Sequence, residues 1–179
     1  MTIEPIIESG MTFGPYPAGQ CFHIEKSKTD AAIQSGVKMA EFLLLRMDSG
    51  KASALWVVEA KSSSPRPGTQ PNFDEFIAEV REKLVNAFSL GWASCLKRHD
   101  QADEELPEPF KELDLSQSGV RFILVINGHP EAWLPPLQEA LQKALRSTIK
   151  TWRFGPNSVV VINETLAKQY ALILASKAL

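Results

Sequence analysis

Short continuous hydrophobic runs and longer helical stripes divide the chain between them. The short runs, which are typical of buried strands, fall at 38–47, 52–61, 120–127 and 158–163, with a weaker candidate at 20–27. Asp48–Lys51 has the composition of a turn, so the first two strong runs predict a hairpin. Serines and prolines over 62–71 then predict a loop, because proline cannot continue sheet pairing.

Three segments have the periodicity of helices. Apolar residues recur at helical spacing over 73–97, with Asn72 as the predicted cap and Glu75 completing a capping box. A second stripe covers 134–149, and 164–179 predicts a final helix. Strands that alternate with helices in the second half of the chain indicate partly parallel pairing and an α/β architecture.

The remaining segments lack a strong period. We expect an irregular N-terminal arm over 1–17, a weak helical turn over 29–36 and an exposed acidic loop over 98–119. A strand candidate follows that loop at once, so it does not mark a domain boundary. A chain of 179 residues suits one domain with a real core, and we predict a single α/β domain over 1–179.

Composition narrows the function classes. The net charge of −2 and pI of about 6.0 show no global basic field of the kind that many nucleic-acid binders carry. Cys21 and Cys95 lie far apart, which excludes a cysteine-rich zinc site and makes a disulfide framework a poor explanation. We recognise no signal peptide and no apolar run of the roughly 18 residues that a membrane span needs. We therefore expect a cytoplasmic protein that does not enter a membrane.

The segment "LWVVEAKSSSPRPG" (55–68) carries the candidate chemistry. Side chains alternate along a strand, so Glu59 and Lys61 share a face and lie where the buried strand ends. A Glu-x-Lys tripeptide is expected by chance in a chain of this composition, so its surroundings decide its meaning. Two solvated residues at a strand end are the simplest interpretation.

Glu41 lies on the preceding predicted strand, and positions 41 and 59 are symmetric about Gly50. A loop with an odd residue count, such as Ser49–Lys51, would set Glu41 opposite Glu59, whereas an even loop would turn it to the other face. Two opposed carboxylates repel each other, and bound Mg²⁺ or Mn²⁺ would offset that repulsion. Alternatively, Lys61 could form a half-exposed salt bridge with Glu41.

Glu41 in "KMAEFLLLR", with Glu59 and Lys61 in "WVVEAKSS", resembles the PD-(D/E)xK superfamily, also called restriction-endonuclease-like. The resemblance covers roughly 20–127. It implies a three-layer α/β core with a mixed central sheet and flanking helices, Glu41 and Glu59 as metal ligands, and Lys61 as a catalytic residue beside them. The chain has Glu41 where the family usually has Asp, and Glu25 or Asp30 are the candidates for a further carboxylate.

This resemblance predicts metal-dependent hydrolysis of phosphodiester bonds in nucleic acid, with DNA favoured over RNA. A nuclease-fold subunit without turnover, acting in a protein or nucleic-acid assembly, is the alternative, and an unrelated α/β ligand-binding domain is a third hypothesis. Without a separate recognition domain, the chain would fit a role with a protein partner or as a homodimer.

Several other polar residues are candidates for the site. Lys83 and Asn86 lie on the long predicted helix, where a solvated face is the simpler interpretation. His23 lies far from the other histidines in the sequence, and we expect it to have a structural role. "NGHP" (127–130) follows a strand end, where α/β proteins often bind ligands, although a turn explains it as well.

Overall fold

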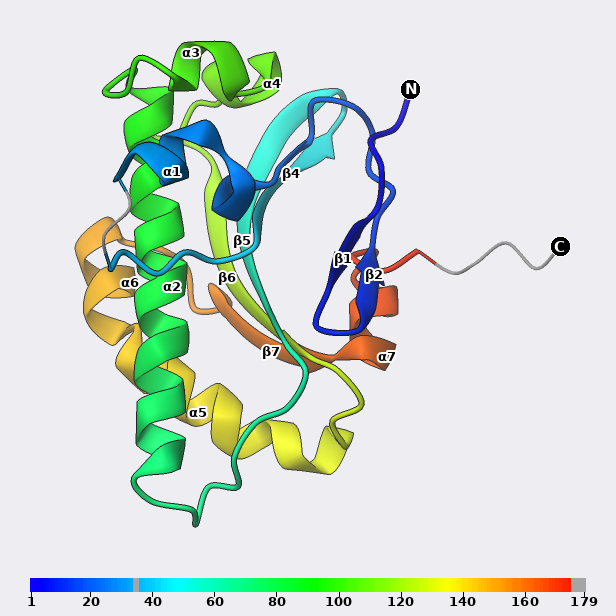
Figure 1. Cartoon of the computed structure of the whole chain (residues 1–179), viewed down its shortest axis with the longest axis vertical. Helices are drawn as coiled ribbons and strands as arrows, with labels where there is room; N and C mark the ends of the chain where they lie inside the picture. The colour runs from blue at the N-terminus through cyan, green and yellow to red at the C-terminus, as the bar shows by residue number, and fades with distance from the viewer. Residues whose placement is uncertain (34–35, 175–179) are drawn as a thin grey trace, which may run out of the picture.

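A five-stranded mixed sheet forms the centre of the fold (Figure 1). The computed structural model describes residues 1–33 and 36–174. Its strands lie in the order β3 (Cys21–Phe22), β4 (Phe42–Asp48), β5 (Lys51–Lys61), β6 (Gly119–Ile126) and β7 (Val159–Asn163). The pairs β3–β4 and β4–β5 are antiparallel, whereas β5–β6 and β6–β7 are parallel. The predicted hairpin and the partly parallel second half are both present.

The turn between β4 and β5 has two residues, Ser49 and Gly50, so of the two alternatives considered the loop has the even count. Both have positive φ, 50° and 80°, as a tight hairpin turn requires. The pairing shifts between Arg46 opposite Ala54 and Met47 opposite Ala52, which leaves Ser53 as the extra residue of a β-bulge. Because of this extra residue, the residues before Met47 face the partners that an odd loop would have given them, although the turn itself is even.

One face of the sheet, the α2 face, is covered by α2 (Asn72–Cys95), α5 (Leu134–Ala144) and α6 (Arg146–Trp152). Gly91 lets α2 approach β4 closely, because a Cβ there would lie 2.5 Å from Leu43 Cδ1. The helix begins at Asn72 and Pro71 is its cap, with no side-chain capping bond. The predicted Asn72 cap is therefore wrong.

The opposite face, the hairpin face, is covered by β1 (Ile6–Glu8), β2 (Met11–Phe13) and α7 (Glu164–Gln169) (Figure 1). The N-terminal segment is thus a paired hairpin and not the irregular arm that we expected, because its apolar residues pack under the sheet. Phe13 meets Phe42 of β4 edge to face, with ring centroids 5.4 Å apart. The predicted final helix ends at Gln169, and its positions 175–179 lie outside the described residues.

The acidic segment 98–119 contains two short helices, α3 (Ala102–Glu105) and α4 (Glu108–Lys111). Ala102 and Phe110 are buried, so this segment covers part of the core and is not simply exposed loop. The weak helical turn expected over 29–36 is α1 (Lys28–Ile33), which follows η1 (Ile24–Lys26), while positions 34–35 are not described. The architecture is α/β, with a five-stranded mixed sheet and flanking helices.

Candidate active site

Glu59 is the most deeply buried charged residue at the candidate site. It lies near the end of β5 and shares the α2 face with Leu55 and Val57, which belong to the core. Its side chain is 0% exposed. Oε1 lies 3.0 Å from the Lys83 ammonium and 3.3 Å from the Lys61 ammonium. Oε2 is buried and has no hydrogen-bond partner in the part of the chain that the structure describes.

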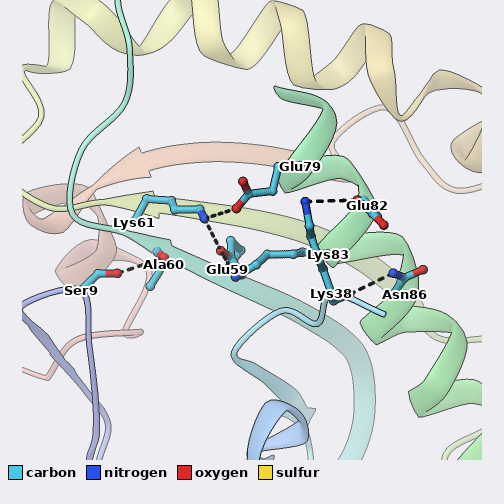
Figure 2. A network of polar contacts seen from close by, with 9 residues as sticks. All are labelled: Ser9, Lys38, Glu59, Ala60, Lys61, Glu79, Glu82, Lys83 and Asn86. Atoms are coloured by element: carbon cyan, nitrogen blue, oxygen red, sulfur yellow. Dashed lines mark hydrogen bonds and ion pairs between the residues drawn. The ribbon is translucent and has the colours of Figure 1, made fainter. Parts of the chain in front are cut away.

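Lys61 links the end of β5 to helix α2. Its Nζ donates to Glu79 Oε1 at 2.7 Å and also lies beside Glu59 (Figure 2). The side chain is 22% exposed, so the ammonium lies at the border between core and solvent. The salt bridge between Lys61 and Glu41 that we considered is not among the described ion pairs.

Lys83 and Glu79 are one helical turn apart on α2, and this spacing aims both side chains at β5 (Figure 2). Lys83 lies between Val80 and Leu84 of the buried stripe, which is why its ammonium reaches a buried carboxylate instead of water. The simpler interpretation of Lys83, a solvated helix face, is therefore wrong. Asn86 donates to the carbonyl of Lys38 at 2.9 Å and ties α2 to the segment before β4.

Glu41 lies one residue before β4 and is 6% exposed. Phe42 pairs with Val58, and extending that register by one residue would set Glu41 opposite Glu59. The ladder is distorted there, because the amide of Glu41 donates to the carbonyl of Val58 at 3.0 Å. Oε2 of Glu41 is also buried and lacks a hydrogen-bond partner within residues 1–33 and 36–174.

Glu41 belongs to a second group of polar side chains, the Glu41 cluster, which consists of Glu8, His23, Glu25 and Glu41. One ligand atom from each lies within 4.8 Å of the others. Carboxylate and imidazole atoms at this spacing are suitable ligands for a divalent cation. Lys26 donates to Glu8 Oε1 at 2.7 Å, which partly neutralises the outer edge of the cluster.

Burial controls the protonation of both carboxyls. It raises the pKa of Glu41 to about 9, and the neighbouring Glu25 and Glu59 carboxyls add to the rise. Burial also raises the pKa of Glu59, although Lys83 and Lys61 oppose that rise. In the absence of a cation, the Glu41 carboxyl therefore holds a proton at neutral pH, and a divalent cation that binds there must displace it.

Lys61 keeps its charge. Burial alone would lower the pKa of its ammonium, but the hydrogen bond to Glu79 and the charge of Glu59 outweigh burial and raise that pKa. The same contact with Lys61 lowers the pKa of Glu79. Together they place a permanent cation at the end of β5, next to a buried carboxylate with one free oxygen.

Sequence reasoning identified Glu41, Glu59 and Lys61, and the structure places all three at one end of the β4–β5 pair. Glu59 and Lys61 are in direct contact, whereas Glu41 is grouped with its own cluster. Glu8 was not predicted as a site residue, because it comes from a segment that we expected to be irregular. His23, which we expected to be structural, has a buried Nε2 with no hydrogen-bond partner among the described residues.

Comparisons with known proteins do not place the chain in a family. The chain matches no protein-family model, no curated protein and no solved structure. None of the helices that the structure describes has the length and apolar character needed to cross a membrane. The geometry around Glu41, Glu59 and Lys61 is therefore the evidence from which a function must be argued.

Proposed function

We propose that this protein is a metal-dependent phosphodiesterase with a restriction-endonuclease-like core, acting on nucleic acid, with DNA favoured over RNA. One observation carries the proposal. Two buried carboxyls, Glu41 and Glu59, lie at the same end of neighbouring strands and each has an unpartnered oxygen, and the cationic Lys61 is in contact with Glu59. Buried polar atoms are normally hydrogen-bonded, so each of these two unpartnered oxygens requires an explanation.

The order of elements supports the fold in this proposal. An antiparallel meander, β3–β4–β5, is followed by α2 and then by β6, which pairs with β5 in parallel. The PD-(D/E)xK resemblance implies a mixed sheet of this kind, with the Glu59–Lys61 motif on the strand that has an antiparallel neighbour on one side and a parallel neighbour on the other. Here β5 occupies that position.

The residues present fit a divalent cation. Glu41 would hold it within the Glu41 cluster, with Glu25 as a further ligand from η1, and Glu59, which lies outside that set, would add its unpartnered oxygen. Hard cations such as Mg²⁺ and Mn²⁺ prefer carboxylate oxygens. When bound, the ion would supply a water of lowered pKa and stabilise charge on a phosphoryl oxygen.

The protein side chains have separate roles in the proposed reaction. Lys61 carries a positive charge at the border of the core, where it can donate to a non-bridging phosphate oxygen and stabilise the charge that develops there. Glu79 holds the Lys61 ammonium 2.7 Å away and so orients it before substrate arrives. Lys83 favours the ionised form of Glu59 from the buried side.

A second candidate function is an assembly subunit without turnover, and one observation favours it. Both Lys61 and Lys83 already contact the same oxygen of Glu59, so the charge of this carboxylate is balanced without a metal. In that case the network would stabilise the fold, and Glu41 would remain protonated. The two functions differ in whether the site binds a cation.

Metal binding and strand cleavage test the proposal together. Calorimetry with Mn²⁺ should show heat for the wild type and none for Glu59→Gln, and plasmid nicking in Mg²⁺ should be lost in the same variant. Glu104→Gln, which removes an exposed carboxylate from α3, is the matched control and should behave as the wild type. A wild type that folds but neither binds Mn²⁺ nor nicks DNA would favour the assembly subunit.

A further inference from the structure

A pocket of about 620 Å³ opens at the carboxyl ends of the parallel strands β5 and β6. The loop that follows β5 forms one wall, and the segment from Asn127 through η2 (Glu131–Trp133) into α5 forms the other. Ligands of α/β proteins commonly bind at this end of a parallel sheet. The position agrees with the "NGHP" segment noted in the sequence, which lines the pocket.

An aromatic side chain with a cationic neighbour dominates this pocket. Trp133 is 50% exposed although it is the largest apolar side chain there. The Arg66 guanidinium carbon lies 5.7 Å from the centre of the Trp133 ring, and the His129 ring lies 5.7 Å away at a steep angle. An exposed indole beside an arginine offers a flat stacking surface next to a site for an anion.

The wall of the pocket contains a polar group that the protein does not satisfy. The Ser64 hydroxyl is buried and has no hydrogen-bond partner in the described part of the chain. The Asn127 and His129 backbone is fixed by protein contacts, because the Asn127 amide donates to the Lys61 carbonyl at 2.9 Å and Asn163 donates to the His129 carbonyl at 2.9 Å. The wall that contains Asn127 and His129 is thus anchored, and Ser64 lies on the opposite wall.

The pocket is adjacent to the candidate active site along the chain. Its loop begins one residue after Lys61, and the Asn127 amide bonds to the Lys61 carbonyl. A strand that spanned both sites would place one nucleotide at Trp133 and a phosphate farther along at the Lys61 ammonium. In a duplex the bases are stacked inside the helix, and only an unpaired base can lie against a protein aromatic ring.

We infer that this pocket binds one unpaired nucleobase of a single-stranded DNA segment, stacked on Trp133, with Arg66 against the adjoining phosphate. This inference rests on the proposed function and names its substrate class. The protein thereby acts on single strands, or on duplexes with unpaired ends, in preference to intact duplex. Stacking also contributes to substrate binding by a chain with a net charge of −2, alongside the phosphate contact of Arg66.

Binding of a fluorescent 12-nucleotide oligodeoxynucleotide, measured by anisotropy in EDTA, tests the inference without turnover. The Trp133→Ala variant should bind roughly 5- to 150-fold more weakly, the range that one stacked base supplies. Trp133→Phe, which keeps an aromatic ring, should recover part of the affinity. Trp152→Ala removes another exposed tryptophan, one that does not line this pocket, and should bind as the wild type does.

Two further measurements sharpen the test. The Arg66→Ala variant should lower the slope of log affinity against log salt by about 0.7, the value for one phosphate contact on a single strand. The matched duplex should bind more weakly than the single strand. Equal affinity for Trp133→Ala and wild type, or a preference for duplex, would overturn the inference. Duplex cleavage that depends on Glu59 would then still support the proposed function, whereas single-strand binding without cleavage would count against the proposed function alone.

Discussion

The two groups of buried carboxyls offset the cost of burial in different ways. At the end of β5, Glu59 is fully buried and two lysine ammonium groups lie within 3.3 Å of its Oε1. In the Glu41 cluster, Glu41 is nearly as buried, but its close neighbours are carboxyls and one imidazole. The charge of Glu59 is balanced by the two lysines, whereas Glu41 avoids burying a charge because it holds a proton.

This difference assigns separate tasks to the two regions. A buried carboxylate that is already paired destabilises the fold when one partner is removed, and its pairing lysines are fixed in place by the same contacts. A protonated carboxyl among other carboxyls is suited to bind a cation, because a divalent ion can replace the proton and offset the repulsion between the ionised carboxylates. The proposed site therefore joins a preformed part at β5 to a part that is completed when metal binds.

The largest expected effect comes from removing the Lys61 ammonium at the end of β5. The Lys61→Met variant should lose about 10²–10³-fold in kcat for strand cleavage, because a preorganised charge near the phosphate is lost. Initial rates on a linear DNA substrate in saturating Mg²⁺ provide the measurement. Lys143→Met, which removes an exposed lysine from α5, serves as the control. Unchanged cleavage in Lys61→Met would remove Lys61 from the mechanism.

The next effect concerns stability and separates the two regions directly. The Lys83→Met variant should lower the free energy of unfolding by roughly 3 kcal/mol, the lower end of the range for removing one partner of a buried pair, since Lys61 remains. Urea denaturation at pH 7 gives this value. The double variant with Glu59→Gln should recover part of the lost free energy of unfolding, because the uncompensated charge of Glu59 is removed. A purely additive double variant would show that the two groups are not coupled.

Metal binding should stabilise the Glu41 cluster more than the Glu59 group at the end of β5. At a Mn²⁺ concentration of 100 times Kd, the free energy of unfolding should rise by about 2.7 kcal/mol in the wild type. The rise should vanish in Glu41→Gln and shrink in Glu25→Gln, as measured by thermal unfolding with and without Mn²⁺. Equal stabilisation of the wild type and Glu41→Gln would place the ion elsewhere.

The protonation of Glu41 predicts a pH dependence in metal-free buffer. Because the folded protein holds a proton on Glu41 up to about pH 9 and the unfolded chain releases it near its usual pKa of about 4.3, the contribution to stability is complete below that lower pKa. It is lost as pH rises toward 9, by about 1.4 kcal/mol per pH unit at most. Glu41→Gln should remove this slope in denaturation curves across pH 5–9, and an unchanged slope would contradict it.

The smallest effect comes from the turn that sets the register of the two strands. Gly50 has φ of +80°, so Gly50→Ala should cost roughly 1 kcal/mol in stability because alanine adopts this conformation poorly. Gly155→Ala, at an open position without positive φ, is the matched control and should cost less. Chemical denaturation of both variants distinguishes a local backbone cost from a general effect of substitution.

Local patterns were sufficient to predict much of the sheet. The buried runs at 52–61 and 120–127 differ from β5 and β6 by no more than one residue at either end, since a strand buried on both faces has a continuous apolar sequence. The paired hairpin at residues 6–13 escaped prediction because its strands have three residues each, too few to show a period. The helices within 98–119 were missed for the same reason, since each has four residues.

The sequence by itself determined that Glu59 and Lys61 share one face at a strand end, because side-chain alternation is a property of the extended backbone. It also determined that Lys83 lies on the same helix as Glu79, one turn away. Only the tertiary structure decided that Lys83 would meet Glu59, that a bulge at Ser53 would correct an even turn, and that Glu8 would join Glu41. Those outcomes depend on contacts between segments far apart in the chain, and such contacts are set by packing of the whole sheet instead of by any local pattern.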